Sequence, residues 1–242
     1  MEHAGILAHS AEGAALCLRA FAAEGIRQLG PHAHPEVTLD CIALAESMPA
    51  WEAADYPAIR AILARSAARL AAAGASFFVC PDNSAHLALE QAGDALPLPG
   101  LHIADEVADQ AVREGRRRVG ILGTRFTMGG WIYPRALGSR GIEHAVPAEE
   151  DRALVDRVIF DELVNGVFSD ASQREYVRVI EGFQRDGCDA VALVCTEIPL
   201  LVGPETSPLP VLDSTRLLAR AAVEVGVGRR PVPVWRGGPP DR

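Results

Sequence analysis

The chain has 242 residues, of which 49% are hydrophobic, and this is enough for one large core or two lobes of ordinary size. Its formal net charge of −9 argues against nucleic acid and anionic membranes as partners, because an acidic surface repels both. No run approaches the ~20 apolar residues of a membrane span, and no signal peptide is evident, so we expect a cytoplasmic location.

The first half of the chain alternates short apolar runs with longer amphipathic segments, as strands and helices do in an α/β fold. We expect its strands over residues 4–8, 37–44, 76–80 and 98–103. We expect its helices over residues 10–29, 56–73, 84–90 and 104–114. Ser10 is a suitable N-cap for the first of these helices, and Gly30-Pro31 ends it.

The second half repeats this alternation. We expect its strands over residues 119–122, 142–146, 189–194 and 209–212. We expect its helices over residues 128–137, 148–163, 172–185 and 213–225. In the loop after the first of these strands, Thr127 is the expected N-cap. The tail, residues 226–242, is rich in Pro, Gly and Arg, and we expect it to be mobile or draped on the surface.

Two features recur at one spacing along the chain. Gly5–Leu7 and Gly120–Leu122 lie 115 residues apart, and so do Cys80 and Cys195. This repetition indicates an internal duplication, so we predict an α/β protein of two pseudo-symmetric lobes with the active-site cleft between them. Each lobe should hold a mostly parallel sheet flanked by helices. The expected first lobe is 1–100 with 210–225, and the expected second lobe is 101–209.

Two of the expected strands end in polar clusters. Residues 76–80 lead into Pro-Asp-Asn-Ser-Ala-His, and residues 190–194 lead into Cys195-Thr196-Glu197. In open α/β sheets, ligands bind at the carboxyl ends of parallel strands. Glu197 is expected to cap the following helix turn, whose N–H groups would attract an anion and lower the pKa of a nearby thiol. The other interpretation of Cys195 is a buried cysteine that packs as a small hydrophobe.

The cysteines indicate neither disulfides nor a metal. The chain has five of them, an odd number, with no C-x-x-C pair and no Cys/His spacing typical of a metal site. The dinucleotide-binding pattern G-x-G-x-x-G is also absent. We therefore expect free thiols in a reducing compartment, and neither a metal nor an organic cofactor.

The two polar clusters match motifs of a known family. Residues 82–86 read D-N-S-A-H and residues 194–197 read V-C-T-E, and further similar stretches are 120–128, 159–163 and 209–214. In these stretches the chain resembles the aspartate/glutamate racemase superfamily, which carries C-N-T-A-H and G-C-T-E at the corresponding strand ends. The resemblance covers residues 5 to about 225. It implies a racemase that needs no cofactor, and a homodimer.

One catalytic position departs from that family. Asp82 stands where the family has its first catalytic cysteine, whereas Cys195 keeps the second. The 115-residue spacing alone would pair Cys80 with Cys195, but the residues 83–86 fix the register in favour of Asp82. The resemblance then implies that Cys195 and Asp82 remove and return a proton on opposite faces of the α-carbon of an amino acid. Burial beside an ionised Cys195 would raise the pKa of Asp82 and bring the two groups closer in basicity.

The groups expected to bind the substrate carboxylate are backbone N–H groups and hydroxyls near the two strand ends. The N–H groups are those of Asn83, Ser84, Thr196 and Glu197, and the hydroxyls are those of Ser84, Thr124, Thr127 and Thr196. His9 and Ser10 are further candidates for substrate binding at the mouth of the cleft, and the other interpretation of His9 is a residue that only fills the strand end. His86, one helical turn after Asp82, either tunes that carboxylate or pairs with a backbone carbonyl. Arg125 either faces solvent or pairs with a second carboxylate of the substrate.

Two other functions fit the same residues. A decarboxylase or isomerase of the superfamily would use Cys195 as its sole proton donor, as the related arylmalonate decarboxylases do. A non-catalytic protein would bind a small acid and keep Asp82 as a hydrogen-bonding strut. In every case the expected partner is a small carboxylic acid or amino acid, and its identity stays open.

Overall fold

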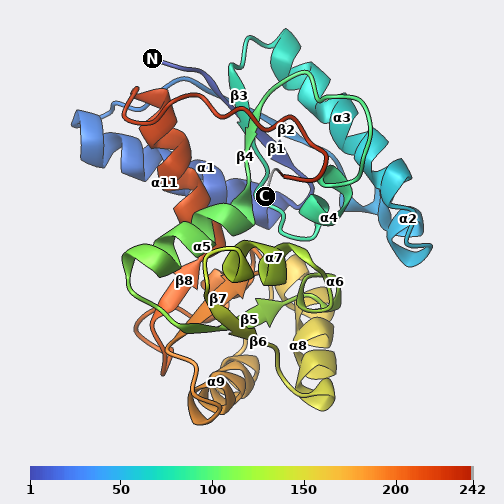
Figure 1. The fold of residues 1–242 in the computed structure, drawn as a ribbon, viewed down its shortest axis with the longest axis vertical. Helices are drawn as coiled ribbons and strands as arrows, with labels where there is room; N and C mark the ends of the chain where they lie inside the picture. Colours follow the sequence, from blue (N-terminus) through green and yellow to red (C-terminus); the bar gives the residue numbers. More distant parts are fainter. Residues whose placement is uncertain (241–242) are drawn as a thin grey trace. The chain divides into compact units, whose positions relative to one another are not determined.

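The computed structural model describes residues 1–240, and the chain divides into two compact units (Figure 1). Unit 1 contains Met1–Ile103 and the described residues from Thr215 onward, whereas unit 2 contains Ala104–Ser214. Within the described residues, each unit holds one four-stranded parallel sheet. The predicted α/β fold of two similar halves is confirmed.

The sheet of unit 1 has the strand order β2-β1-β3-β4. Its strands are β1 (Ala4–Ala8), β2 (Val37–Cys41), β3 (Phe77–Val79) and β4 (Gly100–Leu101). All positions of β1 and β3 are buried, as expected for central strands that are covered on both faces.

The helices of unit 1 follow the predicted order. They are α1 (Ala11–Leu29), the 3₁₀ turn η1 (Leu44–Glu46), α2 (Met48–Glu52), α3 (Tyr56–Ala72), α4 (Ala85–Leu89) and α11 (Ser214–Gly226). Ser10 caps α1 as predicted, because its hydroxyl accepts a hydrogen bond from the backbone N–H of Gly13 at 3.1 Å. The α11 residues Leu218 and Ala222 share a core cluster with Phe21 of α1.

The sheet of unit 2 has the order β6-β5-β7-β8, which is the topology of unit 1 with each strand replaced by its counterpart. Its strands are β5 (Arg118–Gly123), β6 (Glu143–Ala145), β7 (Ala190–Val194) and β8 (Val211–Asp213). Its helices and turns are α5 (Ile103–Arg113), α6 (Arg125–Met128), α7 (Ile132–Gly138), α8 (Glu149–Asp161), η2 (Leu163–Asn165), α9 (Asp170–Arg185) and α10 (Ile198–Leu201).

The glycine of the repeated G-I-L motif has a packing role in both sheets. A Cβ at Gly5 would lie 3.1 Å from the Leu70 side chain of α3, and a Cβ at Gly120 would lie 2.6 Å from the Phe183 ring of α9. A helix side chain therefore rests directly on each central strand, and any larger residue would push it away. This shared constraint accounts for the recurrence of the motif 115 residues later.

The boundaries of the units differ from the expected lobes. Residues 210–214 were expected in the first lobe, but β8 pairs in parallel with β7 and completes the second sheet. Of the residues expected in that returning segment, 210–225, only those from Thr215 onward belong to unit 1. The helix expected over 128–137 is interrupted as well, because Gly129-Gly130 separates α6 from α7.

The C-terminal tail is bound to unit 1. The backbone N–H of Gly100 donates to the carbonyl of Trp235 at 2.7 Å, and that of Leu96 donates to the carbonyl of Arg236 at 2.8 Å. Gly238 N–H donates in turn to the carbonyl of Leu89, the last residue of α4, at 2.8 Å. The described part of the tail is therefore held by backbone hydrogen bonds on unit 1, which corresponds to the draped alternative of our expectation.

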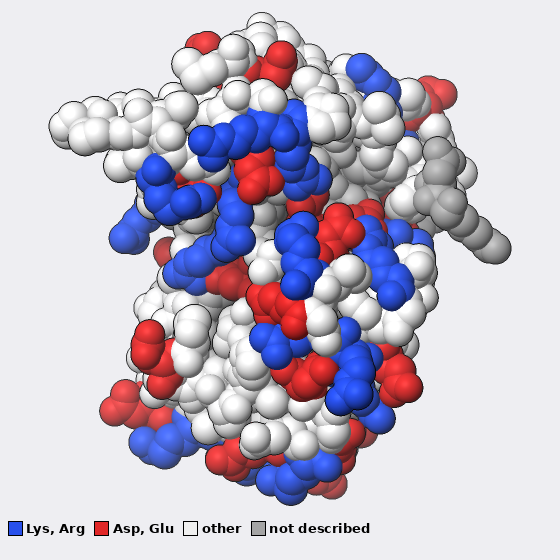
Figure 2. Space-filling view, turned by 60° about the vertical axis from the view of Figure 1, so that its left-hand side comes forward, with Lys and Arg blue, Asp and Glu red and all other residues white. Residues whose placement is uncertain are grey.

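The surface mixes charges of both signs. All 23 basic residues are arginines, and Figure 2 shows them interleaved with aspartates and glutamates over the face it presents. Arg140, for example, pairs with Asp105 at 3.1 Å and with Asp109 at 2.6 Å. None of the helices within residues 1–240 combines the length and the apolar character that a membrane crossing requires.

Candidate active site

The first polar cluster lies where β1 and β3 end. These strands pair in parallel, with Ile6 opposite Val79, so the residues that follow them emerge at the same edge of the sheet. His9 follows β1 and Asp82 follows β3. Nδ1 of His9 lies 3.2 Å from Oδ2 of Asp82. The two predicted site residues are therefore a hydrogen-bonded pair.

Asp82 accepts hydrogen bonds on both carboxylate oxygens. Oδ1 accepts from the backbone N–H of Ala85 at 3.1 Å, in the first turn of α4, while Oδ2 faces His9. Burial acts to raise the pKa of Asp82, but the hydrogen bond and charge of His9 and the N–H of Ala85 outweigh it. The pKa of Asp82 is therefore lowered. This is opposite to the shift we expected from burial beside a thiolate, and it leaves the carboxylate ionised at neutral pH.

His9 is buried, with only 1% of its surface exposed. Because an ionised carboxylate can only accept, Nδ1 of His9 donates to Asp82. The other ring nitrogen, Nε2, is buried and has no hydrogen-bond partner within the described residues. The site therefore contains one ring nitrogen, Nε2 of His9, whose position is fixed through Asp82 and which makes no hydrogen bond to residues 1–240.

His86 holds the backbone of Asp82, not its carboxylate. Its Nδ1 donates to the Asp82 carbonyl at 2.9 Å, and its Nε2 accepts from the backbone N–H of Ile103 at 3.4 Å. Burial, followed by the neighbouring His102, lowers the pKa of His86 to about 3. His86 is therefore neutral at physiological pH, and the second of its two predicted roles is the observed one.

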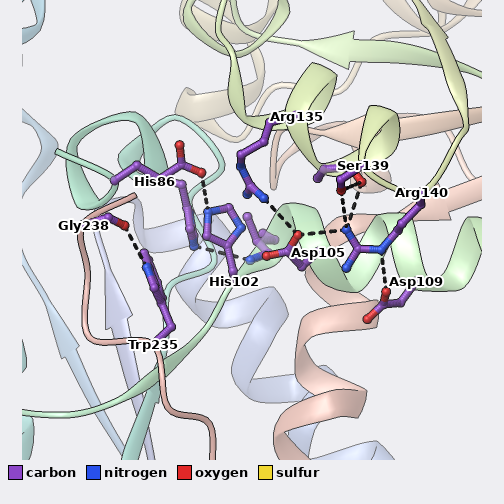
Figure 3. Close-up of polar contacts among 12 residues, drawn as sticks. His86, His102, Asp105, Asp109, Arg135, Ser139, Arg140, Trp235 and Gly238 are labelled. Carbon is purple, nitrogen blue, oxygen red and sulfur yellow. Dashed lines mark hydrogen bonds and ion pairs between the residues drawn. The ribbon is translucent and has the colours of Figure 1, made fainter. Parts of the chain in front are cut away.

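Three residues that the sequence analysis did not single out surround His86. Nε2 of His102 lies 2.9 Å from Oε1 of Glu90, and the His86 and His102 rings lie 4.5 Å apart. The indole of Trp235 stacks on His86 at 6.0 Å with an interplanar angle of 11° (Figure 3). The tail thus closes over the histidine that anchors the Asp82 backbone.

The other predicted residues of this cluster have local roles. Asn83 and Ser84 are buried, and their carbonyls accept from the N–H groups of His86 and Leu87 in the first turn of α4. The Ser84 side chain makes no capping hydrogen bond, because Asp82 occupies that role. The hydroxyl of Ser10 serves as the cap of α1.

The second polar cluster lies where β5 and β7 end. Gly123 and Val194 are paired across these strands, so Thr124 and Cys195 follow at neighbouring positions. The Cys195 thiol donates to Oε2 of Glu197 at 3.1 Å. All three side chains are buried.

Glu197 does not cap the helix turn that follows it. It occupies the N-cap position of α10, but its side chain makes no capping bond. Its carboxylate turns back instead and accepts from Cys195 and, at 2.8 Å, from the hydroxyl of Thr196. This arrangement corrects the predicted role of Glu197, and it gives the thiol a proton acceptor within hydrogen-bond distance.

The threonines after β5 pair with each other. Thr124, and not Thr127 as predicted, caps α6, because its Oγ1 accepts from the Thr127 N–H at 3.2 Å. The two hydroxyl oxygens lie 3.1 Å apart. Arg125 is held by Asp156, which accepts from its guanidinium and from its backbone N–H, both at 2.7 Å. Arg125 is thus already paired with a carboxylate of the protein.

Comparison with known proteins decides the family. Residues 16–222 match the model of the family described as Asp/Glu/Hydantoin racemase. The chain belongs to this racemase family. Within residues 1–240, no three His, Cys, Asp or Glu side chains are grouped so that they could hold a metal ion.

Two solved structures match nearly the whole chain, and a relative of known name matches 70% of it. A provisionally named Asp/Glu racemase from Yersinia pestis is 31% identical over 94% of this chain and all of its own, with a TM-score of 0.80. PH1733, an aspartate racemase homologue from Pyrococcus horikoshii OT3, is 25% identical over 94% and 100% of the two chains, with a TM-score of 0.76. The broad specificity amino-acid racemase RacX of Bacillus subtilis (strain 168) is 23% identical over 176 residues, which are 70% of this chain and 73% of RacX.

For this member of the racemase family, the sequence motifs identified the strand ends that carry the candidate site. They did not identify all the residues that contact the site side chains. The pairing of His9 with Asp82 has no local signal, because 73 residues separate them. The cluster of Glu90, His102 and Trp235 was missed too. A histidine within an apolar run, as in Leu101-His102-Ile103, was the one available sign of a buried polar pair.

Proposed function

We propose that the chain is an amino-acid racemase that uses no cofactor, with Cys195 and the His9–Asp82 pair each acting on one face of the substrate α-carbon. One observation supports this most strongly. The corresponding strand ends of the two sheets each carry a hydrogen-bonded acid–base pair, Cys195 with Glu197 and Asp82 with His9. Racemisation needs this duplication, because one group removes the α-proton while another delivers a proton to the opposite face.

The chemistry of the second pair suits proton transfer. A thiol acts as a base only after it has lost its proton, and the Glu197 carboxylate is within reach to accept it. The carbanion formed at the α-carbon is stabilised by hydrogen bonds to the substrate carboxylate. We propose the backbone N–H groups of residues 83–84 and 196–197 for this, with hydroxyls near both strand ends.

The comparisons support the class of substrate. RacX is named a broad specificity amino-acid racemase, and PH1733 an aspartate racemase homologue. Because Asp156 already pairs with Arg125, we propose amino acids with a single carboxylate as the first substrates to test, with aspartate and glutamate alongside. A cytoplasmic homodimer is the proposed state, as the family resemblance implies.

Cys80 is not proposed as the second proton carrier. It is fully buried, and burial raises its pKa well above the ordinary thiol value. Its sulfur faces the Asp82 carbonyl at 4.0 Å. The surroundings of Cys80 therefore support the alignment in which Asp82, and not Cys80, corresponds to the first catalytic position of the family.

Chiral analysis of an amino-acid panel tests the proposal. Each enantiomer is incubated with the wild type, with Cys195→Ser and with a matched control, Cys188→Ser. The control removes a buried thiol of unit 2 that is not part of the second polar cluster. We expect racemisation by the wild type and the control and at least a hundredfold loss in Cys195→Ser. No racemisation of any acid by the wild type, or full activity in Cys195→Ser, would contradict the proposal.

The decarboxylase alternative is disfavoured by the charge of Asp82. A leaving carboxylate bound beside an ionised aspartate would be repelled, and the lowered pKa keeps Asp82 ionised. Incubation of the protein with disubstituted malonates tests for decarboxylase activity directly. We expect no release of carbon dioxide, and release that depends on Cys195 would instead favour the decarboxylase.

A further inference from the structure

The His9 ring has two nitrogens with different surroundings. Nδ1 is fixed by Oδ2 of Asp82 at 3.2 Å, and Asp82 is itself fixed by the N–H of Ala85 at 3.1 Å. The chain therefore anchors this imidazole on one side through two successive hydrogen bonds. The orientation of the ring determines where Nε2 points.

Nε2 of His9 is a buried polar atom with no partner within the described residues. Such atoms are rare, because burial removes their hydration and nothing in the protein replaces it. Nδ1 carries the proton donated to Asp82, so whenever the ring is neutral its lone pair lies on Nε2. An oriented, unpaired lone pair at a strand end is suited to accept a proton from a ligand.

Building on the proposed racemase function, we propose that Nε2 of His9 is the atom that exchanges a proton with the substrate α-carbon, and that Asp82 positions and stabilises the ring. Asp82 is then a positioning residue, although it stands at the family's catalytic position. His9 becomes the catalytic counterpart of Cys195.

The proton balance of this scheme is closed. In one direction the Nε2 lone pair takes the α-proton, the C–H electron pair remains on the substrate as a carbanion, and the imidazolium is stabilised by the ionised Asp82. The Cys195 thiol then gives its proton to the opposite face and becomes a thiolate. In the other direction the thiolate removes the α-proton and the imidazolium returns one. Exchange with solvent resets both groups.

Asp82 is the poorer candidate for this transfer. Both of its oxygens already accept hydrogen bonds from the protein. Its lowered pKa makes it a weak base, whereas imidazole is the side chain that most often carries protons in general acid–base catalysis. The hydrogen-bond geometry and the basicity thus both favour Nε2 of His9 over the Asp82 carboxylate as the atom that transfers the proton.

His9→Asn separates the two assignments. The asparagine amide nitrogen lies near the position of Nδ1 and can still donate to Asp82, but no atom replaces Nε2. We expect racemisation to fall at least a hundredfold. Exchange of the α-hydrogen with heavy water should persist for the one enantiomer that Cys195 deprotonates, because that half-reaction does not need His9. Imidazole added to His9→Ala should restore part of the racemisation.

The outcomes are distinct. If His9→Asn racemises within tenfold of the wild type, the assignment of His9 is overturned while the racemase function survives. If the wild type neither racemises nor exchanges any acid in the panel, the function itself fails, and the inference falls with it. Thermal unfolding of His9→Asn checks that the variant is folded, and persistent one-sided exchange would exclude a general loss of the site.

Discussion

Oε2 of Glu197 accepts a hydrogen bond from the Cys195 thiol at 3.1 Å and another from Thr196 at 2.8 Å. A carboxylate in this position has two opposed effects on the sulfur. It can accept the thiol proton, yet its negative charge disfavours a thiolate beside it. Replacement of Glu197 should therefore change the reactivity of Cys195 and the racemisation rate in opposite directions.

Glu197→Gln tests this opposition. Removal of the negative charge should increase the rate of Cys195 alkylation several-fold, because the thiolate is no longer repelled. Loss of the proton acceptor should reduce racemisation by about 10²-fold or more. Alkylation followed by mass spectrometry and chiral analysis give the two rates. A parallel fall of both would show that Glu197 serves only to hold the loop in place.

His86 should make stability depend on pH. Its pKa is about 3 in the folded chain and about 6.5 when unfolded, so between these values the unfolded state binds a proton that the folded state does not. The contribution of neutral, buried His86 to the free energy of unfolding is therefore fully present above about pH 6.5, and it is lost as the pH falls toward 3. Between pH 7 and pH 5 this loss is about 2 kcal/mol.

His86→Asn is the matched variant for that prediction. The Asn amide can still donate to the Asp82 carbonyl, but it does not titrate. Denaturant unfolding at pH 7 and pH 5 should show a smaller decrease in the free energy of unfolding for the variant than for the wild type. Equal decreases would mean that His86 is not the group responsible.

The tail should stabilise unit 1 through Trp235. Its indole packs on His86 and His102, and its carbonyl accepts from Gly100. Trp235→Ala should cost about 2 kcal/mol of unfolding free energy, because a large, partly buried ring is removed. The adjacent Val234 is 91% exposed, so Val234→Ala is the control and should cost less than about 0.5 kcal/mol. Equal effects of the two changes would contradict a specific role for the indole.

A thiol at position 82 should remove the need for His9. In the His9→Asn background, Asp82→Cys places at that strand end the residue that the family resemblance implies. We expect the double variant to regain racemisation at least tenfold over His9→Asn, because the new thiol can carry the proton itself. Chiral analysis of both variants measures this. No gain would indicate that position 82 does not reach the α-carbon.

The limits of prediction from the sequence follow from the range of each interaction. The strand Ala190–Val194 was predictable because five consecutive apolar residues precede a polar cluster. The cap of α6 was assigned to Thr127 in place of Thr124, since two threonines three residues apart are equally suitable caps. The Glu197 carboxylate could either cap α10 or accept hydrogen bonds from the Cys195 thiol and the Thr196 hydroxyl, and it does the latter. The spacing of these residues in the sequence does not show which of the two occurs.

The contacts of the tail were beyond any local pattern. Trp235 meets Gly100 and His86 across more than a hundred residues of sequence. Composition alone left open whether this segment is mobile or draped on the surface, and it did not indicate which residues its backbone would contact. Such pairings depend on tertiary packing, which the local preferences of Pro, Gly and Arg do not encode.

The origin of the α-hydrogen in product and remaining substrate tests the central claim most directly. A single enantiomer is incubated with the wild type in heavy water, and both enantiomers are analysed by mass spectrometry at low conversion. With one proton-transfer group on each face of the α-carbon, the product should carry deuterium while the remaining substrate keeps its original hydrogen. Product that retains the original hydrogen would show that a single group moves the proton between the two faces, and this would contradict the account.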